Sequence, residues 1–137
     1  MYDAIMVPVD LAHADKLDKA LSVAADLGQL YDAPLCYVGI AAAAPGAVAH
    51  SPKDYAARLD VFAMEQAATR GVKATSRALM SHDPAVDLDQ ALLEAVRETG
   101  ADLVVMATHA PGLIDRLWPS HGGALAAHAG VSVLLVR

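Results

Sequence analysis

Two short polar segments of this sequence carry residue types that could bind an anionic ligand. Asp10 directly follows the apolar run Ala4 to Val9, and the segment SHGG at 120–123 stands where an Ala-rich helix is predicted to begin. A serine hydroxyl and the free amides of a helix N-terminus are donors that bind phosphate. Glycine lets a phosphate approach the backbone because it has no Cβ. The first question is therefore whether these segments hold a nucleotide.

Both segments also have interpretations that need no ligand. Ser120 could act only as the N-cap of the short helix, and the two glycines could relieve packing against the strand Leu103 to Thr108 or against a partner subunit. Glycine in a first helical turn costs about 1 kcal/mol relative to alanine, so some such reason is needed. Asp10 could cap the loop that follows it or bind a ligand. These alternatives stay open at this point.

The spacing of the histidine, cysteine and acidic residues matches no known pattern for metal binding or covalent catalysis. None of the six histidines is separated from another by three or four positions, and only one cysteine is present, so no metal site is predicted. Cys36 lies in an apolar segment, where we expect a buried thiol. Asp10 has no paired acids that would bind Mg²⁺ with it, so no catalytic residue is assigned. The sequence favours a protein that is not an enzyme.

Length and charge narrow the class of protein. With 137 residues, of which 55% are hydrophobic and 19% charged, we expect one globular domain over residues 1–137. A formal net charge of -6 would repel a phosphate backbone, so no nucleic-acid partner is expected. No apolar run approaches the roughly 20 residues of a membrane helix, and no basic leader precedes the first apolar run. We therefore expect a cytoplasmic protein without membrane insertion.

Apolar runs and helical periodicities alternate along the chain. Short apolar or alternating runs predict five strands, at Ala4 to Val9, Leu35 to Ile40, Val72 to Met80, Leu103 to Thr108 and Ser132 to Val136. Apolar residues spaced three or four apart, together with helix start and stop signals, predict four helices, at Lys16 to Tyr31, Pro52 to about Ala68 with Ser51 as its cap and Gly71 as its stop, Val86 to Thr99 and Ser120 to His128.

Strict alternation of strands and helices is typical of right-handed βαβ units around a parallel sheet. Five strands in this succession fit a flavodoxin-like α/β fold with strand order 3-2-1-4-5 and helices on both faces. The loops that contain Asp10 and begin at Ala107 should then face each other across a crevice. The last strand, Ser132 to Val136, would be an apolar edge that pairing with a second copy would cover, so we expect a homodimer.

Three segments carry a resemblance to a known family. These are VPVD at 7–10, GADLVVM at 100–106 and HAGVSVLLVR at 128–137. With the elements in the expected order over the full length, the chain closely resembles the universal stress protein (UspA-like) family. The resemblance implies a flavodoxin-like, adenine nucleotide alpha hydrolase-like fold and homodimers formed through the last strand. It also implies that the chain falls into either an ATP-binding or a non-binding group.

The resemblance assigns site residues as well. Asp10 matches an aspartate that contacts the nucleotide near adenine and ribose, and Ile40 matches a position whose backbone meets the adenine. ATP-binding members carry G-x2-G-x9-G-[ST] after the fourth strand, where this chain has A-x2-A-x8-P-S. The implied nucleotide-binding residues are Pro8, Val9, Asp10, Ile40, Ala107, His109, Ala110, Ser120, His121, Gly122 and Gly123.

The altered motif weakens the expectation of a ligand. Ala107 and Ala110 replace the first two glycines, and each would cost about 1 kcal/mol if its position required positive φ. Pro119 removes one amide donor. If the motif is aligned without a gap, Ser120 and His121 hold its last two places instead of Pro119 and Ser120.

Two functions follow from the resemblance. The first is a non-catalytic, stress-responsive regulatory protein that binds ATP, with Mg²⁺ accompanying it, or a related adenine nucleotide in the crevice. The second is a nucleotide-independent homodimeric interaction module of the same family, which the replacements at Ala107, Ala110 and Pro119 favour. Slow ATP hydrolysis would need a water-positioning group, and none is identified in the sequence.

Overall fold

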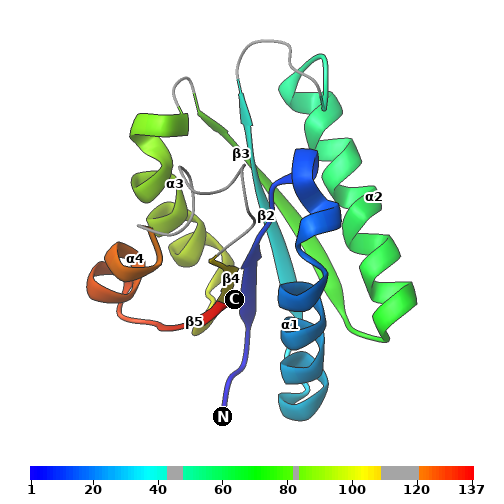
Figure 1. Cartoon of the computed structure of the whole chain (residues 1–137), viewed down its shortest axis with the longest axis vertical. Helices are drawn as coiled ribbons and strands as arrows, with labels where there is room; N and C mark the ends of the chain where they lie inside the picture. Colours follow the sequence, from blue (N-terminus) through cyan, green and yellow to red (C-terminus); the bar gives the residue numbers. More distant parts are fainter. Residues whose placement is uncertain (43–47, 82–83, 109–120) are drawn as a thin grey trace.

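One five-stranded parallel sheet forms the centre of the protein. The computed structural model describes residues 1–42, 48–81, 84–108 and 121–137, without the side chains of residues 42, 84–87 and 121. The strands lie in the order β3-β2-β1-β4-β5, which confirms the predicted order (Figure 1). Their bounds are β1 Ile5–Pro8, β2 Leu35–Ala42, β3 Ala74–Ser81, β4 Leu103–Ala107 and β5 Ser132–Val136.

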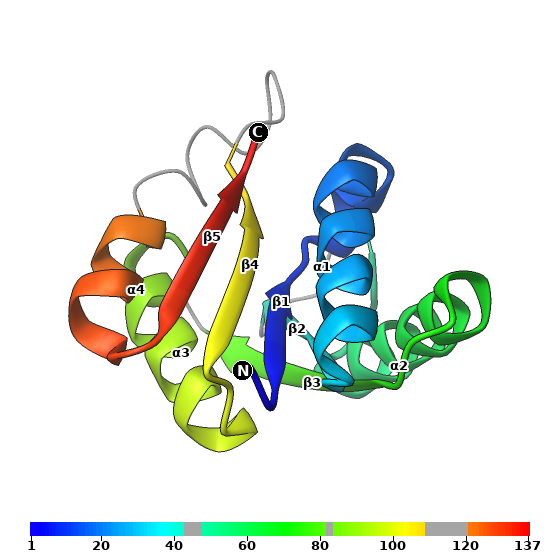
Figure 2. The same ribbon diagram turned by 90° about the horizontal axis from the view of Figure 1, so that it is seen from below.

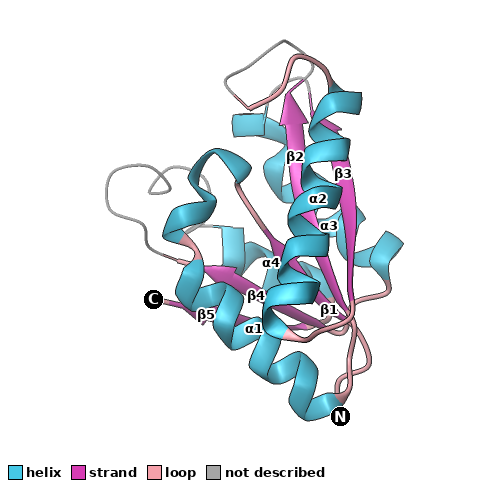
Figure 3. Ribbon diagram, turned by 90° about the vertical axis from the view of Figure 1, so that its right-hand side faces the viewer, coloured by secondary structure: helices cyan, strands magenta, loops and turns pink. Residues whose placement is uncertain are grey.

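Helices cover both faces of this sheet. Helices α1 and α2 pack on one face, which is turned towards the viewer in Figure 3, and α3 and α4 pack on the other (Figure 2). The doubly wound α/β architecture is therefore confirmed. The bounds are α1 Asp18–Tyr31, α2 Pro52–Arg70, α3 Pro84–Thr99 and α4 His121–Ala129, with a short 3-10 helix, η1, at Leu11–Lys16.

The core lies along the central strands, which are covered on both faces. All four residues of β1 are buried, and so are the first four residues of β4. Strand β3, at the edge, instead exposes Thr75 and Arg77. A parallel strand buried on both faces reads as a continuous apolar run, which is why β1 and β4 were recognisable from sequence.

The second crossover helix begins and ends at its predicted signals. The Ser51 hydroxyl accepts a hydrogen bond from the Asp54 amide at 3.1 Å, and Pro52 stands in the first turn. Gly71 ends α2 in the left-handed region, at φ 66°. Proline is tolerated in the first turn because its missing N–H would have no partner there. These local signals position α2, and with it the side chains that α2 brings to the end of β1.

Two local expectations differ from the structure. The segment after Asp10 forms η1, so that α1 begins at Asp18 rather than Lys16. Cys36 is half-buried rather than buried. In the sheet register it pairs with Thr75 of the edge strand β3, whose side chain is exposed, so this part of the face is incompletely covered. Burial raises the pKa of the Cys36 thiol, and a hydrogen bond with Thr75 opposes that shift.

Candidate functional site

The central pair of strands separates at the carboxyl edge of the sheet. Strands β1 and β4 pair only from Ile5 opposite Leu103 to Met6 opposite Val104. Beyond that point β1 continues to Pro8 paired with β2, and β4 continues to its end paired with β5. The sheet therefore opens between β1 and β4. This is the topological switch point, where the crossover from β1 leads to one side of the sheet and the crossover from β4 leads to the other. In open α/β sheets, this is the place where ligands bind.

Asp10 lies at that edge with both carboxylate oxygens engaged. Its Oδ1 accepts a hydrogen bond from the Ala12 amide at 3.1 Å, which makes it the N-cap of η1. Its Oδ2 lies 2.8 Å from Nδ1 of His13. The side chain is still 21% exposed. The capping role considered from sequence is thus present, and a donor from solvent or a ligand can still reach the carboxylate.

Tyr55 of α2 lies close to the segment that contains Asp10 and Leu11. It is buried against β2, so close to Gly39 that a Cβ at that position would lie 2.5 Å from the tyrosine hydroxyl. Burial raises the pKa of Tyr55 to about 12, the negative charge of Asp10 adds to the rise, and a hydrogen bond from the Leu11 amide opposes it. Tyr55 thus connects α2 to the peptide that follows Asp10.

Sequence reasoning missed His13 and Tyr55 as parts of this site. A signal for His13 was available, because a histidine three residues after a capping aspartate can return to it within one turn. The signal for Tyr55 was weaker, since it consisted of Gly39 inside a buried strand, a position where glycine often marks the close approach of another group.

The other residues assigned around β1 and β2 lie near this edge. Pro8 and Val9 are buried, and the Val9 amide donates to the Val38 carbonyl at 2.8 Å, which fixes the end of β1 against β2. Ile40 lies two residues further along β2 and is half-buried. These three assigned positions thus lie at the carboxyl ends of the neighbouring strands β1 and β2, the end at which Asp10 follows β1.

Ala107 ends β4 with strand backbone and pairs with Val136. It is half-buried and is not among the residues with positive φ. The expected cost of placing alanine in a left-handed conformation therefore does not apply at this position. His109, Ala110 and Ser120 lie outside the described residues, as does Pro119.

The two glycines at the start of α4 differ in their surroundings. Helix α4 begins at His121, and Gly122 is buried against β5, where an added Cβ would lie 2.5 Å from a Cδ atom of Leu135. Gly123 is exposed, and an added Cβ would have no atom within 4 Å. Close packing therefore explains why residue 122 is a glycine, but the contact is with β5, whereas we expected β4 or a partner subunit. Close packing does not explain why residue 123 is also a glycine.

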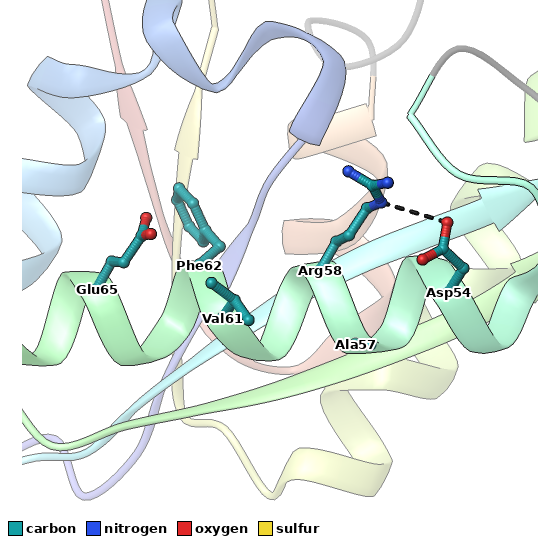
Figure 4. A pocket seen from close by; sticks show the side chains of 6 residues that line it. All are labelled: Asp54, Ala57, Arg58, Val61, Phe62 and Glu65. Atoms are coloured by element: carbon teal, nitrogen blue, oxygen red, sulfur yellow. Dashed lines mark hydrogen bonds and ion pairs between the residues drawn. The ribbon is translucent and has the colours of Figure 1, made fainter.

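A shallow groove of about 360 Å³ lies along α2 (Figure 4). One end is bordered by the ion pair between Arg58 and Asp54, at 3.3 Å, and Phe62 stands further along the helix. The described residues that line it all belong to α2: Asp54, Ala57, Arg58, Val61, Phe62 and Glu65. The residues assigned to nucleotide binding whose positions the structure describes are not among them.

Metal ions and membranes are two further candidates for what the described parts of the chain could bind. No group of three or more His, Cys, Asp or Glu side chains is placed there so that it could hold a metal ion. Among the same residues, no helix combines the length and the apolar character needed to cross a membrane.

Comparison with known proteins connects this geometry to a family. The model of the universal stress protein family matches residues 1–137. The chain belongs to the universal stress protein family. No curated protein sequence is significantly similar to it. The resemblance seen in the segments around Asp10, β4 and β5 is thereby confirmed.

Solved structures of the family share the fold of this chain. A protein of the family from Burkholderia pseudomallei is 24% identical, with a TM-score of 0.68 over 98% of this chain and 96% of that one. A universal stress protein in complex with cAMP is 21% identical, with a TM-score of 0.69 over 99% and 97%. One from Archaeoglobus fulgidus in complex with dAMP is 20% identical, with a TM-score of 0.67 over 99% and 98%. At these identities the likeness establishes the fold.

Proposed function

We propose that this family member is a non-catalytic, stress-responsive regulatory protein of the cytoplasm. It binds ATP or a related adenine nucleotide between the segments that follow β1 and β4. The observation that carries the proposal is the separation of these two strands beyond Met6 and Val104, with the partly exposed carboxylate of Asp10 beside the opening.

Related structures support the choice of ligand class. Two family members of the same fold were solved with cAMP and with dAMP, and one from Arabidopsis thaliana with AMP. The chemistry of Asp10 suits the nucleoside half of such ligands. An ionised carboxylate only accepts hydrogen bonds, so it binds ribose hydroxyls or the adenine amino group and repels phosphate. The phosphates would therefore lie away from Asp10.

The start of α4 is the proposed phosphate side. Gly123 has open space where a side chain would stand, and backbone amides in the first turn of a helix favour anions. In this proposal, Ser120 and the amides of residues 121–123 replace contacts that the missing motif glycines would have made. Mg²⁺ would accompany ATP through its phosphates.

A test begins with protein purified without added nucleotide and then denatured, so that any released small molecule can be identified by chromatography and mass spectrometry. Titration calorimetry with ATP, AMP and cAMP then gives the dissociation constants. Hydrogen bonds to charged groups contribute about 1.5–3 kcal/mol, so Asp10→Ala should weaken binding by about ten- to hundredfold. Ser120→Ala should weaken ATP more than adenosine.

Two controls separate a lost contact from lost structure. Asp10→Asn retains an oxygen that can accept from the Ala12 amide, so it preserves the cap of η1 while removing the charge. Asp26→Ala changes an exposed aspartate on α1 and should leave binding intact. If the wild-type protein releases no nucleotide, and if ATP with Mg²⁺ does not raise its melting temperature, the nucleotide proposal is wrong.

A nucleotide-independent homodimeric interaction module is the second candidate. Its specific support is the packing of Gly122 against Leu135, which accounts for one of the two glycines without a phosphate. Strand β5 also lies at the sheet edge with Leu134 and Leu135 partly exposed. In this candidate, as in the first, two copies pair through Ser132–Val136.

A further inference from the structure

We propose that His13 is a positioning residue for nucleotide binding, which holds the Asp10 carboxylate in the orientation that accepts a donor from the nucleoside. The proposal rests on the proposed function and goes beyond it. It concerns a residue that neither the family motif nor the sequence assignment included.

The chemistry of the two side chains determines which of them donates the hydrogen bond. Nδ1 of His13 lies 2.8 Å from Oδ2 of Asp10. An ionised carboxylate has no proton to give, so Nδ1 must carry the hydrogen and donate it. In the neutral ring Nε2 is then left without a proton. Which ring nitrogen is protonated is thus determined by Asp10.

The local backbone directs the ring towards Asp10. The His13 amide donates to the Asp10 carbonyl at 3.0 Å, which places residue 13 one tight turn after the aspartate. Inside η1, His13 departs from helical geometry, with φ -130° and ψ 28°. The bend lets its side chain return to the residue that caps the same turn.

Two hydrogen bonds orient the Asp10 carboxylate without saturating it. One oxygen accepts from the Ala12 amide and the other from His13. Each carboxylate oxygen has two lone pairs, so each can accept one hydrogen bond more. The side chains of Asp10 and His13 are 21% and 28% exposed, so a ligand can reach part of the carboxylate.

Fixing the carboxylate favours binding because a ligand then loses less conformational freedom with it. Tyr55 of α2 interacts with the Leu11 backbone, which lowers its pKa, and feels the charge of Asp10, which raises it. Among the described residues, His13 is the side chain that controls rotation of the carboxyl group itself. Without it, Oδ2 is free to turn towards water.

Calorimetry on two His13 variants tests this role. His13→Ala removes the donor and should weaken ATP and AMP alike by about tenfold, since a hydrogen bond to a charged group is lost. In His13→Asn the side-chain amide nitrogen takes the place of Nδ1, so most of the affinity should return. His128→Ala, which changes an exposed histidine at the far end of α4, should have no effect.

A nitrogen-15 NMR spectrum of the histidine rings gives a readout that does not need a ligand. At a pH where the ring is neutral, His13 should show a protonated Nδ1 and an unprotonated Nε2. Asp10→Ala should abolish that preference. A histidine that is not bonded to Asp10 would show no such dependence, so the spectrum tests the hydrogen bond and the calorimetry tests its role in binding.

The outcomes separate this inference from the function on which it rests. If the wild-type protein binds nucleotide and His13→Ala binds it equally well, the positioning role is wrong while the proposed function stands. A protonated Nε2 in the wild-type ring also overturns it. If the wild-type protein binds no adenine nucleotide, both proposals fail together. A tenfold loss with recovery in His13→Asn supports both.

Discussion

At the scale of single residues, Gly39 and Tyr55 form a matched pair behind Asp10. The tyrosine side chain occupies the space that a side chain at residue 39 would need, with its hydroxyl oxygen and two ring atoms within 3.1 Å of the position of a Cβ. Tyr55 is 8% exposed, so its ring has little room to move aside. The glycine is therefore required by the approach of α2, and the hydroxyl that it admits reaches the peptide after Asp10.

Gly39→Ala should lower the free energy of unfolding by about 1–3 kcal/mol, because overpacking a buried contact displaces the ring or the helix. Urea denaturation of the apo protein measures the loss. The matched test is Tyr55→Leu, which removes the hydroxyl and the outer ring atoms. In that background, Gly39→Ala should cost much less. An equal cost in both backgrounds would show that the two residues do not meet.

At the scale of elements, α4 approaches β5 closely at one glycine and leaves space at the next. Gly122 faces Leu135 of β5, whereas Gly123 faces outward. Leu135 is itself 44% exposed, and the nearest atom is the end of its flexible side chain, so it can yield to some extent. The two neighbouring glycines thus have different surroundings within one helical turn.

Alanine at residue 123 should raise the free energy of unfolding by up to about 1 kcal/mol, since helix propensity improves and no atom stands in the way. Alanine at residue 122 should gain less, because Leu135 must move. Thermal denaturation of the two variants without nucleotide makes this comparison. If the start of α4 holds phosphate, Gly123→Ala should also weaken ATP binding while adenosine binding stays unchanged. Equal ATP affinities for wild type and Gly123→Ala would contradict the phosphate role.

At the scale of the whole molecule, β5 leaves apolar side chains exposed at one edge of the sheet. Strand β3, at the other edge, exposes the polar residues Thr75 and Arg77 beside Met80, whereas β5 exposes Leu134 and Leu135. An apolar edge with free backbone groups is a template for pairing with another strand. A two-fold arrangement of two copies would cover it with the same strand on each side.

Leu134→Lys should shift the proposed homodimer towards monomer, because a charge on the edge strand opposes pairing with its symmetry mate. Leu134 is already 38% exposed in one copy, so the substitution should leave the fold intact. Light scattering coupled to gel filtration gives the mass in solution, and circular dichroism checks the fold. Leu30→Lys is the matched control, since Leu30 is 71% exposed on α1. A wild-type protein that is monomeric at all concentrations would refute the dimer.

Much of the architecture could be predicted from the sequence because it depends on patterns within each element. Continuous apolar runs marked β1 and β4, since central parallel strands are covered on both faces. Ser51 and Gly71 marked the ends of α2 through local capping chemistry. The thiol of Cys36 was misjudged because its burial depends on the position of its strand beside the sheet edge, and an apolar run does not encode that position.

By itself, the sequence determined the succession of elements, the strand order, the family and the position of Asp10 at the end of β1. The elements follow from local periodicity and caps, the strand order from the strict alternation of strands and helices, and the family and the place of Asp10 from motif residues close together in the chain. Only the tertiary structure decided that Gly122 meets Leu135, that Tyr55 lies over Gly39, and that β1 and β4 separate beyond Met6. These contacts join elements that are distant in sequence, so they depend on how helices and strands pack in space.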